Sequence, residues 1–595
     1  MSRRIQSVAG LLVAGALFAG PGMAQEVRLQ SETARGAIDA ASLLRSLDED
    51  AAPQDYIAAA RADYRRVLTA LYAEGYYSVV VSITIDGIEA ADIQPLAAPD
   101  SIEEVVIRVE PGPQFTFGAV RMTPLPPETG LPDALAPGAP ARSGEIERAV
   151  RGVVGSWRDL GYAKVDVTDQ SIVARHADEE LDVAVDFDTG PRLRFGNLAV
   201  SGNEVVSDAR IRQIAGLPVG EVFSPAEITR AERRLRRTGT FQSVAFTENE
   251  VIGPGDTLGL TAQVSEAVPR RFGFGLELSS IEGLRVSGFW LHRNFLGGAE
   301  RFRVDAEIAG INGETGGTDY SIGASFNRPA VFGPDTDYFL TGEISRQDEP
   351  GFLLDSISVE TGFSRIVTDD LTVRAGVGLL YADEESDLGA RQYTLLTLPL
   401  DATLDRRDDS ADAQDGYYVG LVATPFISID DSFTGARLFA DLRGYLTLGA
   451  EDQLTFAGRG QAGSVLGASL VQAPADFLFY SGGGGTVRGQ PYQSLGIETM
   501  QGMDVVTTGG TSFIGAQLEA RYLFRENLSI VGFYDVGHVG DTSVPSEGGD
   551  WHAGTGLGVR YDTGIGPIRL DIGTPASGDD AFGGVEVYIG IGQAF

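Results

Sequence analysis

The sequence of 595 residues contains no cysteine, a single lysine, Lys164, and only four histidines. Without cysteine, neither a disulfide framework nor a thiolate metal site can form. The histidines are scattered without metal-ligand spacing, and no Gly-x-Ser-x-Gly nucleophile motif is present. We therefore expect no catalytic residues, no metal and no cofactor, and the sequence does not predict an enzyme.

Long apolar runs are also missing. The run Val8–Phe18 is shorter than the ~20 residues that a membrane-spanning helix needs, and no later run reaches that length. Arg3 and Arg4 precede it, and the small-residue site Gly22-Met23-Ala24 follows, which is the layout of a secretory signal peptide. We predict that residues 1–24 are a signal peptide cleaved after Ala24.

Positive charge is scarce. Lysine and arginine number 46 against 83 acidic residues, which gives a formal net charge of −37. A nucleic-acid partner needs basic clusters that neutralise phosphates, so this balance argues against one. The same balance is compatible with a surface that faces the cation-rich lipids of an outer membrane.

The region from Gln25 to about Arg270 contains repeated units. The segment Gly112–Gly118 (GPQFTFG) matches Gly190–Gly196 (GPRLRFG), and an amphipathic helix pattern ending in a Gly-Tyr turn precedes each copy. A third helix pattern starts at Ser224-Pro225. We predict three α+β units, residues 25–112, 113–191 and 192–268, whose sheet edges accept extended peptides as added strands.

From near Arg271 the sequence changes to strict alternation of apolar and polar residues. In residues 301–308, for example, every second residue is apolar and the others are Arg, Asp or Glu. A soluble sandwich also alternates, so this pattern alone does not decide the fold. Together with the export signal it favours a transmembrane antiparallel β-barrel, whose outer face is apolar and whose lumen is polar. At roughly 20 residues per strand, residues 269–595 hold about 16 strands.

The end of the sequence supports the same interpretation. Residues 585–595 alternate, and the last residue is the aromatic Phe595. This resembles the C-terminal recognition signal of outer-membrane barrels, although Gln593 stands where a hydrophobic residue is usual. We expect the barrel to lie in the outer membrane and the three units to lie in the periplasm.

A glycine-rich segment, Ser481–Gly489, ends in Val487-Arg488-Gly489. It does not match a phosphate-binding loop, because no Lys-Ser/Thr follows and no strand-to-helix transition is predicted there. The segment resembles the sixth extracellular loop of the outer-membrane assembly superfamily that includes BamA and TamA. In that superfamily the loop ends in Val-Arg-Gly-Tyr, whereas Gln490 replaces the tyrosine here.

The same superfamily carries an aromatic-x-Asp-x-Gly motif on a late strand, and Phe533, Asp535 and Gly537 match it. Alternation directs Asp535 into the lumen, and it directs Glu519 inward from the preceding strand. We expect Arg488 to reach both carboxylates, because a planar guanidinium binds carboxylates well. Two interpretations of this contact are equally supported: a structural brace, and a switch.

Three further segments resemble superfamily motifs in the same order, so the resemblance covers essentially the whole mature chain. They are Arg293–Gly298, Asp405–Gly416 and Gly554–Asp571. The number of repeats resembles the TamA branch, which has three POTRA domains, whereas BamA typically has five. The resemblance implies a factor that helps autotransporters and other unfolded outer-membrane proteins to insert, with a TamB-like inner-membrane-anchored partner.

A barrel closes by pairing its first strand with its last, here about Arg271–Ser279 with Val585–Phe595. The residues that we assign to this seam are Gly273, Gly275, Gly590, Gly592 and Phe595. Glycine weakens packing in a strand, and an open seam presents edges that template an incoming strand. Relief of curvature explains any single one of these glycines equally well.

Other functions remain open at this stage. They are a dedicated secretion pore of the two-partner type, a general insertase like BamA, and a passive porin. A porin needs neither three repeats nor the Arg488 loop, so it is the weakest of these alternatives.

Overall fold

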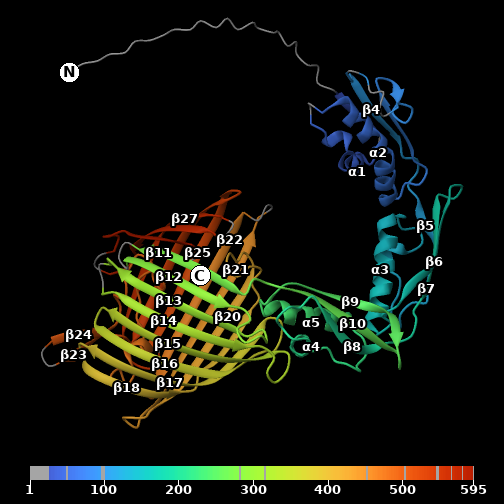
Figure 1. Cartoon of the computed structure of the whole chain (residues 1–595). Coiled ribbons are helices and arrows are strands. Elements are labelled where there is room, and N and C mark those ends of the chain that lie inside the picture. The colour runs from blue at the N-terminus through green and yellow to red at the C-terminus, as the bar shows by residue number, and fades with distance from the viewer. Residues whose placement is uncertain are drawn as a thin grey trace, which may run out of the picture. The chain divides into compact units, whose positions relative to one another are not determined.

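The structure is a computed structural model of the chain (Figure 1). It describes residues 26–595 apart from 32, 49–50, 95–98, 100, 280–282, 314–315, 450–452, 502–503, 545–547, 564–565, 579–580, 592 and 594. The predicted signal peptide therefore lies outside the described residues. The chain divides into two compact parts. The first part comprises the residues up to Arg194 together with Gly220–Pro225 and Pro254–Thr257. The second part comprises the remaining residues up to Phe595.

The first part contains two α+β units. The first unit has the elements β1 (Glu26–Gln30), α1 (Arg35–Ala41), η1 (Leu44–Ser46), α2 (Pro53–Ala73), β2 (Val80–Ile85), β3 (Ile88–Glu89) and β4 (Glu104–Glu110). The sheet order is β1-β4-β2-β3. The apolar stripe of α2, which includes Ile57, Val67 and Leu71, packs in one core with Ile83 and Val105 of the sheet. Because these residues follow helical spacing, they lie on one face of α2, and this face packs in the core.

The second unit repeats this plan with β5 (Thr116–Thr123), η2 (Asp133–Leu135), α3 (Ser143–Asp159), β6 (Asp166–Arg175) and β7 (Glu180–Asp188). The sheet order is β5-β7-β6, so β6 lies at an edge. Ile146, Val153 and Trp157 of α3 pack on Leu181 and Val185 of the central strand. Most of β6 is exposed, including Ile172 and Val173.

The third unit has β8 (Arg194–Ser201), α4 (Asp208–Ala215), α5 (Pro225–Arg237), β9 (Phe241–Gly253) and β10 (Thr257–Glu266), in the sheet order β8-β10-β9. Helix α5 begins at Pro225, as the sequence predicts, because proline at the first helical position lacks only an N–H that has no helical partner. No helix in the described part of the chain has both the length and the apolar character to cross a bilayer.

The rest of the second part is a closed antiparallel barrel (Figure 1). Its elements are β11 (Arg270–Ser279), β12 (Gly283–His292), β13 (Arg301–Ile311), β14 (Asp319–Arg328), β15 (Thr336–Glu349), β16 (Phe352–Ile366), β17 (Leu371–Ser386), β18 (Gly389–Thr397), β19 (Leu400–Asp405), β20 (Gly416–Ser428), β21 (Thr434–Leu448), β22 (Leu454–Leu466), β25 (Ser512–Arg525), β26 (Leu528–Gly540), β27 (Asp550–Tyr561), β28 (Ile568–Pro575) and β29 (Glu586–Ile591).

Two of these elements, β18 and β19, are halves of one strand. Both pair with β17 and β20 in a continuous register, and only Leu398 and Pro399 separate them. Proline has no N–H for the ladder, so it interrupts the strand there. The described residues therefore form a 16-stranded barrel, which confirms the predicted fold and strand count.

Alternation sorts the strand residues between two faces. On β25, Leu518 and Tyr522 are exposed on the outer face, whereas Gln517, Glu519 and Arg521 are buried in the lumen. An apolar exterior around a charged interior is the arrangement that a membrane barrel requires.

The third unit is attached to one end of the barrel, which we call the proximal rim. It consists of the turns 293–300, 329–335 and 367–370, after β12, β14 and β16. Arg234 of α5 forms two hydrogen bonds with the Asp335 carboxylate, at 3.1 and 2.6 Å, and Arg237 forms a third at 2.9 Å. The Arg210 Nε of α4 donates to the Gly298 carbonyl at 2.9 Å. Hydrogen bonds from the charged arginine side chains of both helices therefore hold the third unit against the rim.

Candidate functional site in the barrel lumen and at the seam

The segment 467–511 joins β22 to β25, and its residues Ala475, Phe479 and Arg488 are buried against the inner wall. We call it the lumen loop, and it carries η3 (Ala475–Phe477), β23 (Ile497–Gln501) and β24 (Asp504–Thr508). Gly489 has a φ of +86°, which favours glycine, and a Cβ on it would lie 2.5 Å from the Thr574 backbone. A Cβ on Gly537 of β26 would lie 2.3 Å from the Ser481 Oγ. Both glycines allow the loop to approach the wall closely.

Arg488 is 1% exposed and points into a cluster of carboxylates. Its Nε and Nη2 donate to the two Asp535 oxygens at 2.7 and 3.0 Å, and its Nη1 donates to Glu519 at 2.6 Å. The guanidinium carbon lies 3.8 Å from the centre of the Phe533 ring, which adds a cation–π contact. The structure thus brings together the three charged residues that the sequence analysis selected.

Three further residues belong to this cluster. Alternation already directs one of them, Arg521, into the lumen, whereas sequence reasoning did not select Arg560 or Asp571. The Arg488 Nη1 also lies 3.2 Å from Asp571 of β28, which Arg560 of β27 binds through its Nη2 at 3.2 Å. Arg521 binds Glu519 at 2.8 Å. Alternation would have directed Arg560 and Asp571 inward as well, because both have exposed apolar neighbours on each side in their strands.

We call these six residues the lumen network. Its members are Arg488, Arg521, Arg560, Glu519, Asp535 and Asp571, and each is at most 5% exposed. Three guanidiniums face three carboxylates, so the formal charges cancel. Burial of charges is costly unless they are paired and hydrogen-bonded, and here every carboxylate has at least one arginine partner. The six buried charges therefore compensate one another as one network rather than as separate ion pairs.

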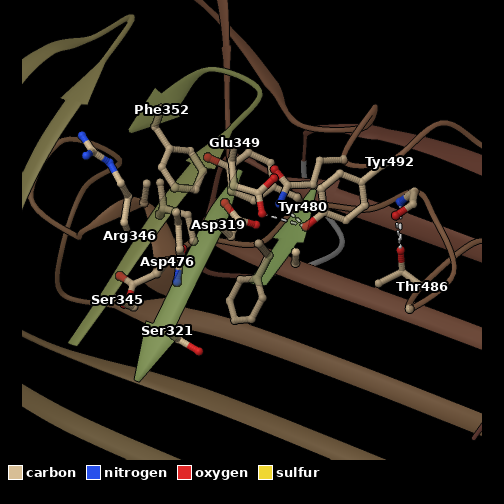
Figure 2. Close-up of a pocket in the computed structure, with 18 of the residues that line it drawn as sticks. Asp319, Ser321, Ser345, Arg346, Glu349, Phe352, Asp476, Tyr480, Thr486 and Tyr492 are labelled. Carbon is tan, nitrogen blue, oxygen red and sulfur yellow. Dashed lines mark hydrogen bonds between the residues drawn. The ribbon is translucent and has the colours of Figure 1, made fainter. Parts of the chain in front are cut away.

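Other residues near Arg488 in the lumen loop are also buried or hydrogen-bonded to the barrel wall. Val487 is fully buried, and Gln490 donates to the Ala553 carbonyl at 2.8 Å. The Tyr492 hydroxyl donates to Glu349 of β15 at 2.9 Å, beside a lumen cavity of about 530 Å³ between the loop and the wall (Figure 2). The loop is thus bonded to both the early and the late strands of the barrel.

The seam joins β11 to β29 through few residues. The described register pairs are Leu278 with Ile589 and Ser279 with Tyr588. In contrast, β11 forms ten pairs with β12, and β28 forms six with β29. Within the described residues, no register pair joins β29 to residues 270–277 of β11. Among the described residues, the β11–β29 ladder of the seam therefore has fewer register pairs than the neighbouring β11–β12 and β28–β29 ladders.

The seam residues chosen from the sequence occupy different places. A Cβ on Gly273 or Gly275 would meet the side chains of Phe289 or Ser287, at 2.2 and 2.5 Å, so both glycines make room for β12. A Cβ on Gly590 would lie 3.5 Å from the Glu277 Oε1. Gly592 lies outside the described residues. Gly590 therefore lies beside Glu277 rather than beside Gly275.

Phe595 also departs from the expected seam. It is buried in the lumen with Ala413, Tyr445 and Ala457, and its ring centre lies 6.5 Å from that of Tyr445. Residue Gln593 accepts a hydrogen bond from Arg560 at 3.0 Å. Strand β29 ends at Ile591, and the contacts of Gln593 and Phe595 direct the chain inward, so the predicted strand 585–595 is too long.

Among the described residues, no group of three or more His, Asp or Glu side chains has an arrangement that could hold a metal ion. The lumen network itself consists of carboxylates already bound by arginine. The contacts within the network are therefore ion pairs and hydrogen bonds, which are compatible with both a structural brace and a switch.

Comparisons with known proteins agree with this architecture. The model of the Omp85 superfamily domain matches residues 294–595, and the POTRA model, a surface antigen variable number repeat, matches residues 193–267. The outer membrane protein assembly factor BamA of Nitratidesulfovibrio vulgaris is 24% identical over 435 residues. The match covers 70% of this chain and 53% of that protein, so the chain spans about half of the relative's length.

Solved structures show the same fold. BamA from Haemophilus ducreyi lacking POTRA domains 1–3 superposes with a TM-score of 0.63 at 16% identity, over 80% of this chain and all of the other. CdiB from Acinetobacter baumannii gives a TM-score of 0.51 at 12% identity, over 81% of this chain and 91% of the other. At these identities the likeness concerns the fold alone.

Proposed function

The chain belongs to the Omp85 superfamily, and from this premise we propose that it is an assembly factor that inserts other β-barrels into the outer membrane. Its barrel lies in the outer membrane and its N-terminal units lie in the periplasm. We infer that it works by templating strands at the seam, without enzymatic chemistry. Its proposed substrates are unfolded outer-membrane proteins, including autotransporters.

The seam carries this proposal. Among the described residues, two register pairs hold β11 to β29, next to ladders of ten and six pairs. An unpaired strand edge presents N–H and C=O groups that an incoming strand can bind. A seam with so few pairs opens at a lower cost than any neighbouring ladder, and opening exposes two such edges. The exposed edges then act as the template.

The N-terminal units supply a first binding surface in the same proposal. Strand β6 lies at the edge of its sheet and is ten residues long and largely exposed. An extended substrate segment adds to such an edge through main-chain bonds, which need little sequence specificity. Three periplasmic units also support a role like that of TamA, with a TamB-like protein anchored in the inner membrane as partner.

A disulfide across the seam tests the function directly, because the chain has no cysteine of its own. Leu278→Cys with Ile589→Cys joins residues that face each other in the seam register. In proteoliposomes that hold the purified protein, oxidation of this pair should stop insertion of a test barrel, and a reductant should restore it. Insertion is measured by protease protection of the test barrel.

The matched control links β11 to β12, a ladder that has no need to open. Leu276→Cys with Val286→Cys joins another register pair on the outer face. Its oxidation should leave insertion unchanged. Full insertion by the locked seam variant would contradict strand templating.

A further inference from the structure

A second cavity lies inside the proximal rim. It has a volume of about 310 Å³, and the end of α5 and the inner wall of the barrel enclose it. We call it the rim cavity. Its lining residues are Arg237, Thr238, Leu291, Ala299, Arg301, Arg303, Ser325, Phe326, Asn327, Pro329, Asp337, Phe339, Thr341 and Arg374. It is separate from the lumen network and has no part in the proposed seam function.

The charge of the lining is unusual for so acidic a chain. Four arginines and one carboxylate, that of Asp337, line the cavity. Asp337 uses its Oδ1 to accept the Ala330 N–H at 3.1 Å. Among the lining side chains guanidinium groups therefore outnumber carboxylates by four to one, so the inner surface of the cavity offers mainly cationic hydrogen-bond donors, which favour an anion.

Three of these arginines are fixed by carboxylates outside the lining. Arg237 binds Asp335 at 2.9 Å, Arg303 binds Asp305 at 2.8 Å, and Arg374 binds Glu360 at 2.7 Å. A guanidinium has five N–H donors, so such a pair still leaves donors for another acceptor. The Nε of Arg374 is one of these, since it is buried and has no hydrogen-bond partner among the described residues. The donors are held in place before a ligand arrives.

Arg301 differs from the other three. It begins β13 and is half-buried, and no hydrogen bond or ion pair within 4.0 Å joins its guanidinium group to the described part of the chain. The charged groups that interact electrostatically with it are Arg303, Arg293 and Asp337. Two of these repel it. An unpaired cation held beside other cations is stabilised by an anion between them.

We propose that the rim cavity binds a phosphate group, with Arg301 and Arg374 as its main ligands. Guanidinium groups bind phosphate oxygens through paired N–H bonds, and Ser325, Asn327 and Thr341 add hydroxyl and amide groups to the lining. The volume is at the lower end of the ~300–1,000 Å³ of small-ligand sites, so it suits a compact anion. The phosphate is either free or part of a lipid headgroup.

A bound phosphate would also connect two parts of the protein. Arg237 belongs to the third unit, whereas Arg301 and Arg374 belong to β13 and β17. All three line the same cavity, so one anion adds a bridge between the unit and the rim. The inference holds whether or not the seam opens.

Isothermal titration calorimetry of the full chain tests the proposal. The protein is kept in an uncharged detergent and a phosphate-free buffer, and it is titrated with inorganic phosphate and, separately, with dihexanoyl phosphatidic acid. The variants Arg301→Gln and Arg374→Gln each remove one ligand, so one of them suffices if the other fails to fold. The control Arg285→Gln removes a lumen arginine that lies outside the rim cavity beside Glu307, at 3.6 Å.

We expect one saturable site whose Kd rises at least about tenfold in Arg301→Gln and Arg374→Gln and stays unchanged in Arg285→Gln. Saturation by inorganic phosphate identifies the free ion as sufficient, and saturation by the lipid alone identifies a headgroup. The proposal is overturned if neither probe saturates. It is also overturned if the folded Arg301→Gln and Arg374→Gln variants bind as well as the native chain.

Discussion

Arg488 of the lumen loop lies 3.2 Å from Asp571 of β28, although 83 positions separate the two residues in the sequence. Strand β28 pairs with β29, which forms one side of the seam. The next residue, Gly489, donates its N–H to the Tyr588 hydroxyl of β29 at 3.2 Å, and Tyr588 is itself a register partner in the seam. The loop is therefore fastened both to the strand next to the seam and to one strand of the seam itself.

Replacement of Arg488 should destabilise the barrel. The variant Arg488→Ala leaves Glu519, Asp535 and Asp571 with only Arg521 and Arg560 as partners. Loss of one partner from a buried ionic cluster costs about 3–5 kcal/mol, and we expect the free energy of unfolding in urea to fall by that amount. Arg488→Lys keeps the charge and should lose less. An unchanged midpoint for Arg488→Ala would show that the network does not stabilise the fold.

A methyl group at Gly537 should displace the lumen loop. Its Cβ would lie 2.3 Å from the Ser481 Oγ, and crowding of this kind costs about 1–3 kcal/mol. Gly532→Ala on the same strand is the matched control, because its nearest neighbour, on Leu557, is 3.9 Å away. Protease cleavage within the loop should accelerate in Gly537→Ala only. Equal cleavage of both variants would contradict close contact between loop and wall.

The Asp335 carboxylate should hold the third unit on the proximal rim. In Asp335→Asn, Arg234 is left buried without its charged partner, so hydrogen exchange of α5 amides should become roughly tenfold faster. Asp369→Asn removes the contact with Arg233, in which both side chains are more than half exposed, and it should change exchange little. Similar effects in the two variants would argue against a special role for Asp335.

The same carboxylate predicts a pH dependence. Burial raises the pKa of Asp335, but hydrogen bonds from Arg234 and Arg237 lower it by more, so the net pKa lies below the ordinary 3.8. A lowered pKa gives stability that is present above the unfolded pKa and is lost as the pH falls through the folded pKa. The ratio of α5 exchange rates between Asp335→Asn and the native chain should be constant above about pH 4 and approach one below it. A constant ratio at all pH values would refute this.

Conductance in planar bilayers should separate an insertase from a secretion pore. The lumen loop lies inside the barrel and Arg488 fastens it there, so the native chain should conduct poorly. Release of the loop in Arg488→Ala should increase both the size and the frequency of openings. A large, steady conductance of the native chain would favour the pore.

Much of the architecture was predictable because apolar residues recur every three to four positions in a helix but every second position in a strand. Helical spacing in α2 and α3 and strict alternation after Arg271 identified the repeats and the barrel. Alternation also directed Glu519 and Asp535 inward. It would have given Asp571 and Arg560 as well, but knowing that they meet Arg488 requires the register of strands that are far apart in sequence.

Other features could not be predicted from pattern alone. The inward course at Phe595 depends on packing with Tyr445, which is a contact between distant segments. The attachment of α4 and α5 to the rim relies on arginines, which on most amphipathic helices face solvent. The seam register likewise emerged only from the paired strands, since glycine positions carry no register information.

The equal numbers of arginine and carboxylate in the lumen network restrict how this protein can diverge during evolution. Loss of any one member leaves a buried charge without compensation, so a first substitution is harmful unless a second follows at another strand. Positions 488, 519, 521, 535, 560 and 571 should therefore change together among descendants of this chain, keeping their charges balanced even where the residues differ.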